Sequence, residues 1–159
     1  ELCESTMQIV RERARSAGVT LACNPAAPQA IVRGDRHLLR QIVVNLLTNG
    51  IKFTERGGSV SMSWSGRADG SLALAVADTG VGMTEEDCRR VLEPFGRGSA
   101  ELARARHDTG LGLTICRQFA EMHGRRLELQ SAPGKGTTVS VILPAERAMV
   151  REPQKAAAA

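Results

Sequence analysis

The feature that most constrains the fold is residues 41–54, an apolar segment with the periodicity of an α-helix. Its apolar side chains recur at helical spacing, which places them on one side of a helix. They are Ile42, Val43, Leu46 and Leu47, together with Leu39 just before the segment. Asp35 is a good N-cap for this helix, because its carboxylate can accept hydrogen bonds from the first free backbone N–H groups. The helix therefore has an apolar side to bury against another layer.

A narrow polar face lies beside this apolar side. Asn45, Asn49 and Lys52 share it, because successive residues of a helix are rotated by about 100°. Solvated helix faces usually mix charges of both signs, whereas this one has two neutral amides and one ammonium group. Amide oxygens suit a hard cation, and the nearby positive charge suits phosphate. The set fits a metal–phosphate complex; the alternative is that both asparagines are ordinary surface residues.

The composition indicates one globular domain and argues against nucleic-acid binding. A chain of 159 residues, 42% of them hydrophobic, can bury a core. Only 3% are aromatic, which disfavours recognition of nucleic acids by base stacking. The net charge of +4 comes largely from scattered arginines and suits an anionic ligand. Without a membrane-spanning apolar run or a signal-peptide pattern, we expect a cytoplasmic domain with no direct membrane contact.

The cysteines give no sign of a metal site or a disulfide framework. They are spread along the sequence without a C-x-x-C pair, at Cys3, Cys23, Cys88 and Cys116. We expect small, buried hydrophobic residues in a reducing compartment.

Periodicity and capping signals predict helices in four parts of the chain. They are residues 1–17 ended by Gly18, residues 35–54, a short stretch after Thr84 that stops before Pro94, and the residues after 110–112, ended by Gly124. The short helix starts with a capping box, in which Thr84 pairs with Asp87. Residues 96–108 contain small residues and arginines without a clear period, so we expect a mobile loop there.

Alternating apolar residues predict two hairpins and two short strands. They are residues 60–64 with 72–76 around the turn 66–70, residues 127–129 with 139–143 around the turn 133–136, and the short strands 19–23 and 31–32. Since the strands come mainly as antiparallel hairpins, we predict an α/β (α+β) two-layer sandwich. A mixed, mostly antiparallel sheet would be covered on one face by three main helices.

An aspartate followed by glycines ends the strand at residues 72–76. The Asp78 carboxylate is expected to be half-buried there, and Gly80 and Gly82 let the backbone come close to a ligand. A carboxylate acceptor beside bare backbone suits the exocyclic amine of adenine. The alternative is a tight turn in which Asp78 bonds to its own backbone.

Glycines also open the last long helix. Free N–H groups and the positive end of the helix dipole make such a terminus an anion site, and Gly110 and Gly112 remove steric obstacles. Arginines just upstream can reach a triphosphate, or alternatively form a solvated basic loop. They are Arg97, Arg104 and Arg106.

Five segments follow one another in the order of the N, G1, F, G2 and G3 boxes of a known family. They are Asn45 with Asn49 and Lys52; Asp78 with Gly80, Gly82 and Met83; Glu93 with Phe95 and Arg97; Gly110 with Gly112 and Leu113; and residues 134–138. The chain closely resembles the catalytic and ATP-binding domain of bacterial sensor histidine kinases, in the GHKL superfamily. The resemblance covers residues 1–144. It implies a Bergerat-type fold with an ATP lid over residues 96–108, hinged near Phe95.

The resemblance implies how ATP would bind. Asp78 would accept a hydrogen bond from the adenine amino group, with Thr137 or Thr138 assisting from the last strand. Asn49, with Asn45, would hold Mg²⁺ bridging the phosphates. Further positions of the family's nucleotide site correspond to Gly80, Gly82, Met83, Phe95, Thr109, Gly110, Leu111, Gly112 and Leu113.

The resemblance also implies the reaction. Asn45, Lys52 and Arg97 would be the catalytic residues, with Lys52 and Arg97 binding phosphate oxygens. The γ-phosphoryl group of ATP would pass to a histidine, mainly through positioning and electrostatics.

Several alternatives to a histidine kinase stay open. Hydrolytic relatives usually have a glutamate at the position of Asn45, and an amide cannot act as a general base, so a GHKL-type ATPase is disfavoured. A serine kinase of the anti-sigma type is another member of the superfamily. A nucleotide-independent docking module is the third alternative. Two departures from the family pattern support it, namely Gly50 in place of alanine and Asp108 in place of glycine.

We predict one domain over residues 1–146 and a disordered tail over 147–159. None of His37, His107 and His123 has the sequence context of a phosphoacceptor histidine. The acceptor is therefore expected on a separate dimerisation and phosphoacceptor domain, with a response regulator as the downstream partner. Because dimerisation would belong to that other part, we expect this chain to be a monomer.

Overall fold

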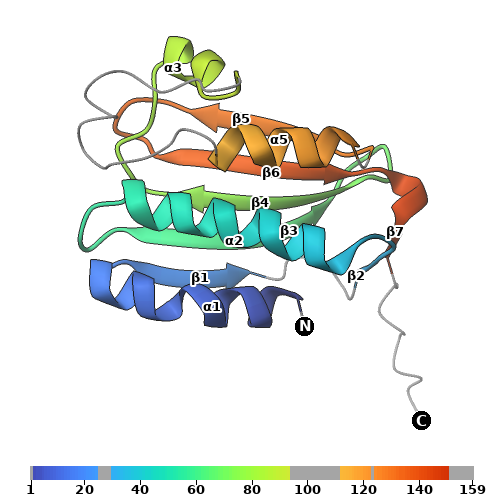
Figure 1. The fold of residues 1–159 in the computed structure, drawn as a ribbon, viewed down its shortest axis with the longest axis horizontal. Helices are drawn as coiled ribbons and strands as arrows, with labels where there is room; N and C mark the ends of the chain where they lie inside the picture. The colour runs from blue at the N-terminus through green and yellow to red at the C-terminus, as the bar shows by residue number, and fades with distance from the viewer. Residues whose placement is uncertain (1, 25–29, 94–111, 123, 151–159) are drawn as a thin grey trace.

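The fold is built on a five-stranded sheet with the strand order β1-β3-β4-β6-β5 (Figure 1). The computed structural model describes residues 2–24, 30–93, 112–122 and 124–150. The strands are β1 Thr20–Asn24, β3 Ser59–Gly66, β4 Leu72–Asp78, β5 Arg126–Ser131 and β6 Thr137–Leu143. Neighbours in this sheet are antiparallel except β1 and β3, which are parallel. The predicted mixed, mostly antiparallel sheet is confirmed.

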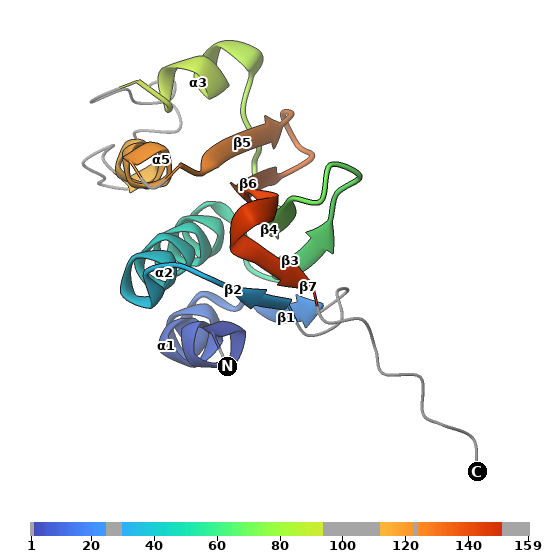
Figure 2. The same ribbon diagram turned by 90° about the vertical axis from the view of Figure 1, so that its right-hand side faces the viewer.

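Three of the helices in the described ranges cover one face of this sheet. Figure 2 shows α1, α2 and α5 on the same side, while α3 lies beyond β5 at one edge. Their bounds are α1 Leu2–Ala17, α2 Arg36–Phe53, α3 Glu85–Arg90 and α5 Gly112–Met122. The predicted two-layer sandwich is therefore confirmed.

The core lies between the helices and the inward-facing rows of the strands. Because side chains alternate along a strand, every second residue of β3, β4 and β6 points toward the helices. The buried ones are Val60, Met62, Leu72, Leu74, Val76, Val139, Val141 and Leu143. From α2, the predicted apolar side packs onto them, with Leu39, Ile42, Val43, Leu46 and Leu47 all buried. Burial of these side chains is the main source of stability.

The helix boundaries follow the predicted capping residues. Asp35 Oδ1 accepts hydrogen bonds from the N–H groups of His37 and Leu38 at 2.8 and 3.1 Å. At the far end of α1, Val19 N–H bonds to the Ala14 carbonyl at 2.9 Å, the pattern of a Schellman motif centred on Gly18. Gly124 ends α5 in the same way, with Arg125 N–H bonding to the Ala120 carbonyl at 2.7 Å.

The short helix α3 starts as predicted, with a reciprocal pair between Thr84 and Asp87. Thr84 Oγ1 accepts from the Asp87 N–H at 3.1 Å and donates to Asp87 Oδ2 at 3.0 Å. The N-cap half of the predicted capping box is confirmed, whereas the Asp87 carboxylate bonds to the Thr84 hydroxyl in place of the Thr84 backbone N–H described for a capping box.

A second, two-stranded sheet corrects the predicted tail. The strand β2, Ala30–Val32, pairs antiparallel with β7, Ala148–Val150, which follows the 3₁₀ turn Ala145–Arg147. The disordered tail was predicted to start at residue 147, yet residues 148–150 form a strand. They supply the hydrogen-bond partners for the backbone of β2, which does not join the main sheet. Residues 151–159 lie outside the described part of the chain.

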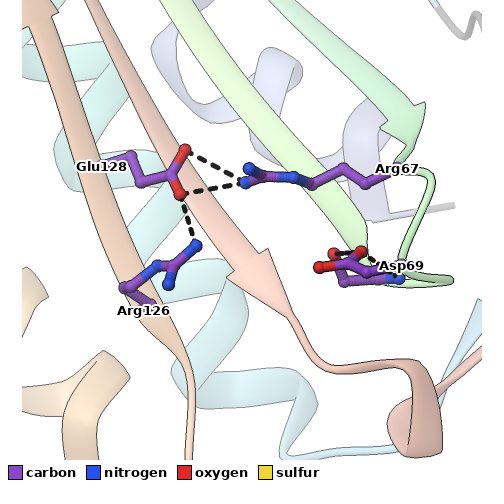
Figure 3. Close-up of polar contacts among 5 residues, drawn as sticks. Arg67, Asp69, Arg126 and Glu128 are labelled. Carbon is purple, nitrogen blue, oxygen red and sulfur yellow. Dashed lines mark hydrogen bonds and ion pairs between the residues drawn. The ribbon is translucent and has the colours of Figure 1, made fainter.

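Polar contacts brace the turn between β3 and β4 against β5 (Figure 3). Arg67 reaches across to Glu128, with its Nη1 atom 3.0 Å from both carboxylate oxygens. Arg126 donates to the same carboxylate at 2.7 Å. Asp69, on the turn itself, accepts from the N–H of Ser71 at 2.9 Å. These contacts lie at the end of β4 opposite Asp78.

The structure brings two of the dispersed cysteines together. The Trp64 indole N–H donates to Cys3 Sγ at 2.9 Å. Burial and the neighbouring Cys3 thiol raise the pKa of Cys23. All four cysteines are free thiols, but among them only Cys116 is fully buried, so the predicted burial holds for one. No helix in the described ranges has both the length and the apolarity needed to cross a membrane.

Candidate active site

A row of polar side chains crosses three strands at one end of the sheet. Asp78, Thr137 and Ser131 lie side by side, because Asp78 pairs with Thr137 across β4 and β6, and Thr137 pairs with Ser131 across β6 and β5. Each lies two residues beyond the last inward-facing apolar residue of its strand. Because side chains alternate along a strand, all three side chains point toward the helix layer. The core therefore ends in a polar edge beneath the C-terminal half of α2.

Asp78 is held by backbone hydrogen bonds on one of its carboxylate oxygens. The N–H groups of Gly80 and Thr137 both donate to Oδ1, at 2.9 and 3.1 Å. No described residue donates to Oδ2. Desolvation of the half-buried carboxyl raises the pKa of Asp78, although the two hydrogen bonds oppose this. The geometry leaves one oriented acceptor at the polar edge.

Ser131 joins the loop after Asp78 to the turn between β5 and β6. Its hydroxyl accepts from the Met83 N–H at 2.9 Å and lies 2.9 Å from both the Gly136 carbonyl and Thr137 Oγ1. Ser131 was not among the predicted site residues. The signal was present, because Ser131 follows Leu127 and Leu129 in the two-residue period of the inward face.

The glycines after Asp78 are required by contacts within the protein. A side chain at Gly80 would overlap the Phe53 carbonyl, and Gly82, with φ of +67°, packs against the Ala132 carbonyl. The Val81 N–H also bonds to the Phe53 carbonyl at 3.3 Å. In this structure, the glycines let the loop pack closely on the end of α2 and on the β5–β6 turn. Their predicted role, a close approach of the backbone to a ligand, comes in addition to this packing.

Gly50 fits α2 closely onto this edge. A Cβ atom there would lie 3.1 and 3.2 Å from the two Val60 methyl groups and 3.6 Å from Asp78 Cβ. Glycine costs about 1 kcal/mol of helix propensity relative to alanine. In return, it allows α2 to pack tightly on the sheet at this position. This departure from the family pattern leaves the polar face of α2 in place.

The polar face of α2 lies toward α5. Asn45 Nδ2 donates to Cys116 Sγ at 3.2 Å, which joins the two helices at their midpoints. Figure 1 shows α2 and α5 running in opposite directions. One turn further along α2 is Asn49, and one turn back along α5 is Gly112, so these two lie at the same level. Asn49 therefore lies on the same side of α2 as Asn45, at the level of the N-terminus of α5.

Cys116 is a buried thiol with one identified hydrogen-bond donor. It is 1% exposed, and its sulfur also lies 3.9 Å from the Ile42 carbonyl oxygen. Burial raises the pKa of the Cys116 thiol to about 11, with the hydrogen bond from Asn45 opposing the shift. At physiological pH it is an S–H group.

The start of α5 is tied to the residues that follow α3. Thr114, 3% exposed, donates from its hydroxyl to the Glu93 carbonyl at 2.9 Å. Arg117 Nη1 donates to the Leu92 carbonyl at 3.1 Å. The start of α5 and residues 92 and 93 are therefore held beside each other. Predicted site residues in that segment lie outside the described part, namely Phe95, Arg97, Thr109, Gly110 and Leu111, as does the predicted ATP lid.

The remaining predicted residues are placed as follows. Lys52 ends the polar face, with Nζ 5.4 Å from the centroid of the Phe53 ring. Met83 is linked through its N–H to Ser131, and Leu113 packs against the core. Thr138 pairs with Ala77 and is on the face away from the helices, so Thr137 is the threonine that lies beside the Asp78 side chain.

The donor set fits a magnesium–nucleotide complex. Amide oxygens from Asn45 and Asn49 are hard, neutral ligands, and Lys52 with the N-terminus of α5 supplies positive potential for phosphate. Within the described ranges, no group of three or more His, Cys, Asp or Glu side chains could hold a metal ion. Together, these amides and positive groups could hold a divalent cation beside phosphate oxygens.

Comparison with known proteins identifies the family. The family profile described as "Histidine kinase-, DNA gyrase B-, and HSP90-like ATPase" matches residues 34–147. Among curated proteins, the histidine protein kinase DivJ of Caulobacter vibrioides is 43% identical over 144 residues, covering 91% of this chain and 24% of DivJ. The signal transduction histidine-protein kinase BaeS of Escherichia coli is 36% identical, covering 89% of this chain and 30% of BaeS. The chain thus spans about a quarter of the DivJ length.

Solved structures agree with this assignment. Full-length ShkA in complex with AMPPNP superimposes with a TM-score of 0.80 at 26% identity, covering 96% of this chain and 30% of ShkA. The mycobacterial sensor histidine kinase MprB gives a TM-score of 0.72 at 26% identity, covering 90% of this chain and 91% of that structure. The chain belongs to the family of histidine kinase-, DNA gyrase B- and HSP90-like ATPases, and within it to the catalytic and ATP-binding domains of sensor histidine kinases.

Proposed function

We propose that this domain binds Mg·ATP and transfers its γ-phosphoryl group to a histidine on a separate dimerisation and phosphoacceptor domain. The observation that carries the proposal is the polar edge formed by Asp78, Thr137 and Ser131. It lies at the end of the apolar core, below the face of α2 that presents Asn49 and Lys52.

Adenine would bind at Asp78. The carboxylate is oriented by two backbone donors on Oδ1, which leaves Oδ2 to accept a hydrogen bond from the exocyclic amine. Because this acceptor is already oriented, little conformational entropy is lost when it binds the amine. The adenine base would also cover the adjoining apolar side chains. Thr137, beside Asp78, would supply the second polar contact.

The phosphates would lie between α2 and the start of α5. Asn49 lies at the level of Gly112 there, and the free N–H groups of the first turn of α5 favour an anion. Asn45 and Asn49 would hold Mg²⁺. The ion would bridge the phosphates and neutralise charge on the γ-phosphoryl group. Lys52 and, from the segment outside the description, Arg97 would bind phosphate oxygens.

Transfer to a protein acceptor is favoured over hydrolysis by the identity of Asn45. An amide cannot remove a proton from water, so the position lacks the general base that an ATPase of this kind would need. The Asn45 amide is also bonded to the Cys116 sulfur, which fits a role in holding a geometry. The acceptor histidine and the response regulator are expected partners outside this chain.

Calorimetric titration with Mg·ATP tests the proposal directly. The wild-type chain should bind, and Asp78→Asn should weaken binding by roughly 10- to 100-fold, because one hydrogen bond to a charged group is lost. Asp69→Asn is the matched control at the opposite end of the sheet, and its dissociation constant should equal that of the wild type. A wild-type chain that binds no ATP would contradict the proposal and favour a docking module.

Labelling with γ-³²P-ATP tests the reaction. The chain alone should stay unlabelled, whereas its native phosphoacceptor helices, when added, should acquire an acid-labile label. Acid-labile phosphate on the isolated chain would show that one of its own histidines is the acceptor. Release of inorganic phosphate without any labelling would identify an ATPase.

A further inference from the structure

Two thiols from different elements meet beside the single tryptophan of the chain. Cys3 lies in the first turn of α1, and Cys23 lies in β1, opposite Met62 of β3. Trp64 follows Met62 two residues further along β3, so Cys23, Met62 and Trp64 all point toward the helix layer. The Trp64 indole N–H donates to Cys3 Sγ at 2.9 Å. Accordingly, the start of α1 lies near the arrowhead end of β1 in Figure 1.

The two thiols also interact with each other. Burial raises the pKa of Cys23, and the charge of a Cys3 thiolate and a hydrogen bond between the two thiols raise it further. Sulfur atoms in such contact need little side-chain movement to form a bond. Both side chains are partly exposed, so a small oxidant in water can reach them.

Trp64 makes Cys3 the better nucleophile of the pair. An indole N–H can only donate, so the Cys3 sulfur is the acceptor in this hydrogen bond. A donor is therefore in place for the thiolate form of Cys3, and the thiolate is the form of cysteine that attacks.

We propose that Cys3 and Cys23 are an oxidation site, at which a hydroperoxide joins them in a reversible disulfide that fastens α1 to the edge strand β1. A disulfide that forms in a reducing compartment is typically transient, so this one would form only when oxidant is present. The inference does not depend on the proposed function. Trp64 pairs with Leu74, whereas Asp78 pairs with Val60 toward the other end of the same two strands.

The reaction has two steps. The Cys3 thiolate attacks one peroxide oxygen, which forms an S–O bond, breaks the O–O bond and releases hydroxide. The Cys23 sulfur then attacks the Cys3 sulfur, so that the S–S bond forms and the S–O bond breaks, and the leaving hydroxide takes the Cys23 proton as water. The two sulfurs together lose two electrons, which reduce the peroxide to water.

Peptide mapping of the full chain after treatment with a small excess of hydrogen peroxide tests the proposal. The intact mass should fall by two hydrogen atoms. Trypsin cleaves after arginine, so under non-reducing conditions residues 1–11 and 16–33 should appear as one linked peptide that dithiothreitol separates. Cys88→Ser, which removes another partly exposed thiol, is the matched control and should form the same link. Cys3→Ser should not; if that variant does not fold, Cys23→Ser replaces it.

Two further readouts follow from where the bond forms. Because Trp64 contacts Cys3, its fluorescence should be quenched as the disulfide forms. The melting temperature should rise by roughly 5–10 °C, because the bond closes the chain between residues 3 and 23 in the unfolded state. Trp64→Phe removes the N–H donor but keeps an aromatic ring, so it should slow the loss of mass several-fold at neutral pH.

Several outcomes would overturn the inference. Addition of oxygen atoms to Cys3 without a link to Cys23 would show that the two sulfurs cannot reach each other. A link through Cys88, or one between two copies of the chain, would assign the reactive thiols elsewhere. A chain that peroxide leaves unchanged would have no oxidation site at all, and an unchanged rate in Trp64→Phe would remove the assigned role of Trp64.

Discussion

Asp78 has opposite effects on stability and on the proposed binding of ATP. Its pKa is raised because the charged carboxylate is partly desolvated, so ionisation costs folding free energy. An asparagine would keep the two backbone hydrogen bonds to Oδ1 without that cost. We therefore predict that Asp78→Asn, which weakens ATP binding, also makes the nucleotide-free domain more stable at pH 7, as measured by thermal unfolding.

The pH dependence of this stability difference has a definite sign. The pKa of Asp78 is higher in the folded state than in the unfolded state, so the folded state favours the protonated carboxyl. That carboxyl loses its proton as the pH rises through the folded-state pKa, and the folded domain then becomes less stable. The advantage of Asp78→Asn should accordingly be full at neutral pH and shrink as the pH falls below the folded pKa of Asp78. An advantage that grows on acidification would contradict the assigned direction.

Ser131 supports the loop after Asp78 without being a predicted ligand contact. Removing its hydroxyl leaves the Met83 N–H, a partly buried donor, without its acceptor. We predict that Ser131→Ala costs about 1–2 kcal/mol in urea unfolding and weakens ATP binding several-fold. Ser140→Ala, the same change on the outer face of β6, should stay within about 0.5 kcal/mol of the wild type. Equal effects of both variants would rule out a special role for Ser131.

At the level of elements, the start of α5 depends on one buried hydroxyl. Thr114→Val keeps the shape of the side chain but leaves the Glu93 carbonyl without this donor. We predict a loss of about 1–2 kcal/mol in unfolding free energy and faster hydrogen exchange over residues 91–93. Thr20→Val, at an exposed position of β1, is the control and should change neither quantity. Unchanged exchange in Thr114→Val would mean that the Arg117 contact alone holds the two segments together.

The elements that the sequence predicts well are those specified locally. Asp35, Gly18 and Gly124 are capping residues whose hydrogen bonds involve their own helix, and the hairpin turns lie between alternating strands. The pairing of β2 with β7 was missed because its partners are far apart in sequence and each strand is short. Nothing within residues 148–150 signals which strand they will meet.

In the candidate site too, locally specified features were predicted from the sequence, whereas contacts between distant parts of the chain were not. The box residues were found from their spacing, but the contact of Asn45 with Cys116 depends on how two separate helices pack. The choice between Thr137 and Thr138 needed the register of β4 with β6, since one step along a strand changes the face.

At the scale of the whole molecule, acid should weaken the fold through the ion pairs of the β3–β4 turn. The Arg67 guanidinium, with Arg126, lowers the pKa of Glu128, so its stabilising form is the ionised one. That contribution is present above the ordinary pKa of a glutamate and is lost as the pH falls through the lowered one. Glu128→Gln should flatten the fall in melting temperature below about pH 4.3, at a cost of less than about 1 kcal/mol at neutral pH. An unaltered acid profile would show that the pair is fully screened.

The contacts of Thr114 and Arg117 with residues 92 and 93 also have a consequence for how the domain tolerates changes in chain length. They join the start of α5 directly to the residues after α3, through groups outside residues 94–111. Each doubling of the chain length between two points that are already joined costs only about 0.6 kcal/mol of entropy. We therefore expect insertions between residues 93 and 112 to leave the stability of the sheet and its polar edge nearly unchanged.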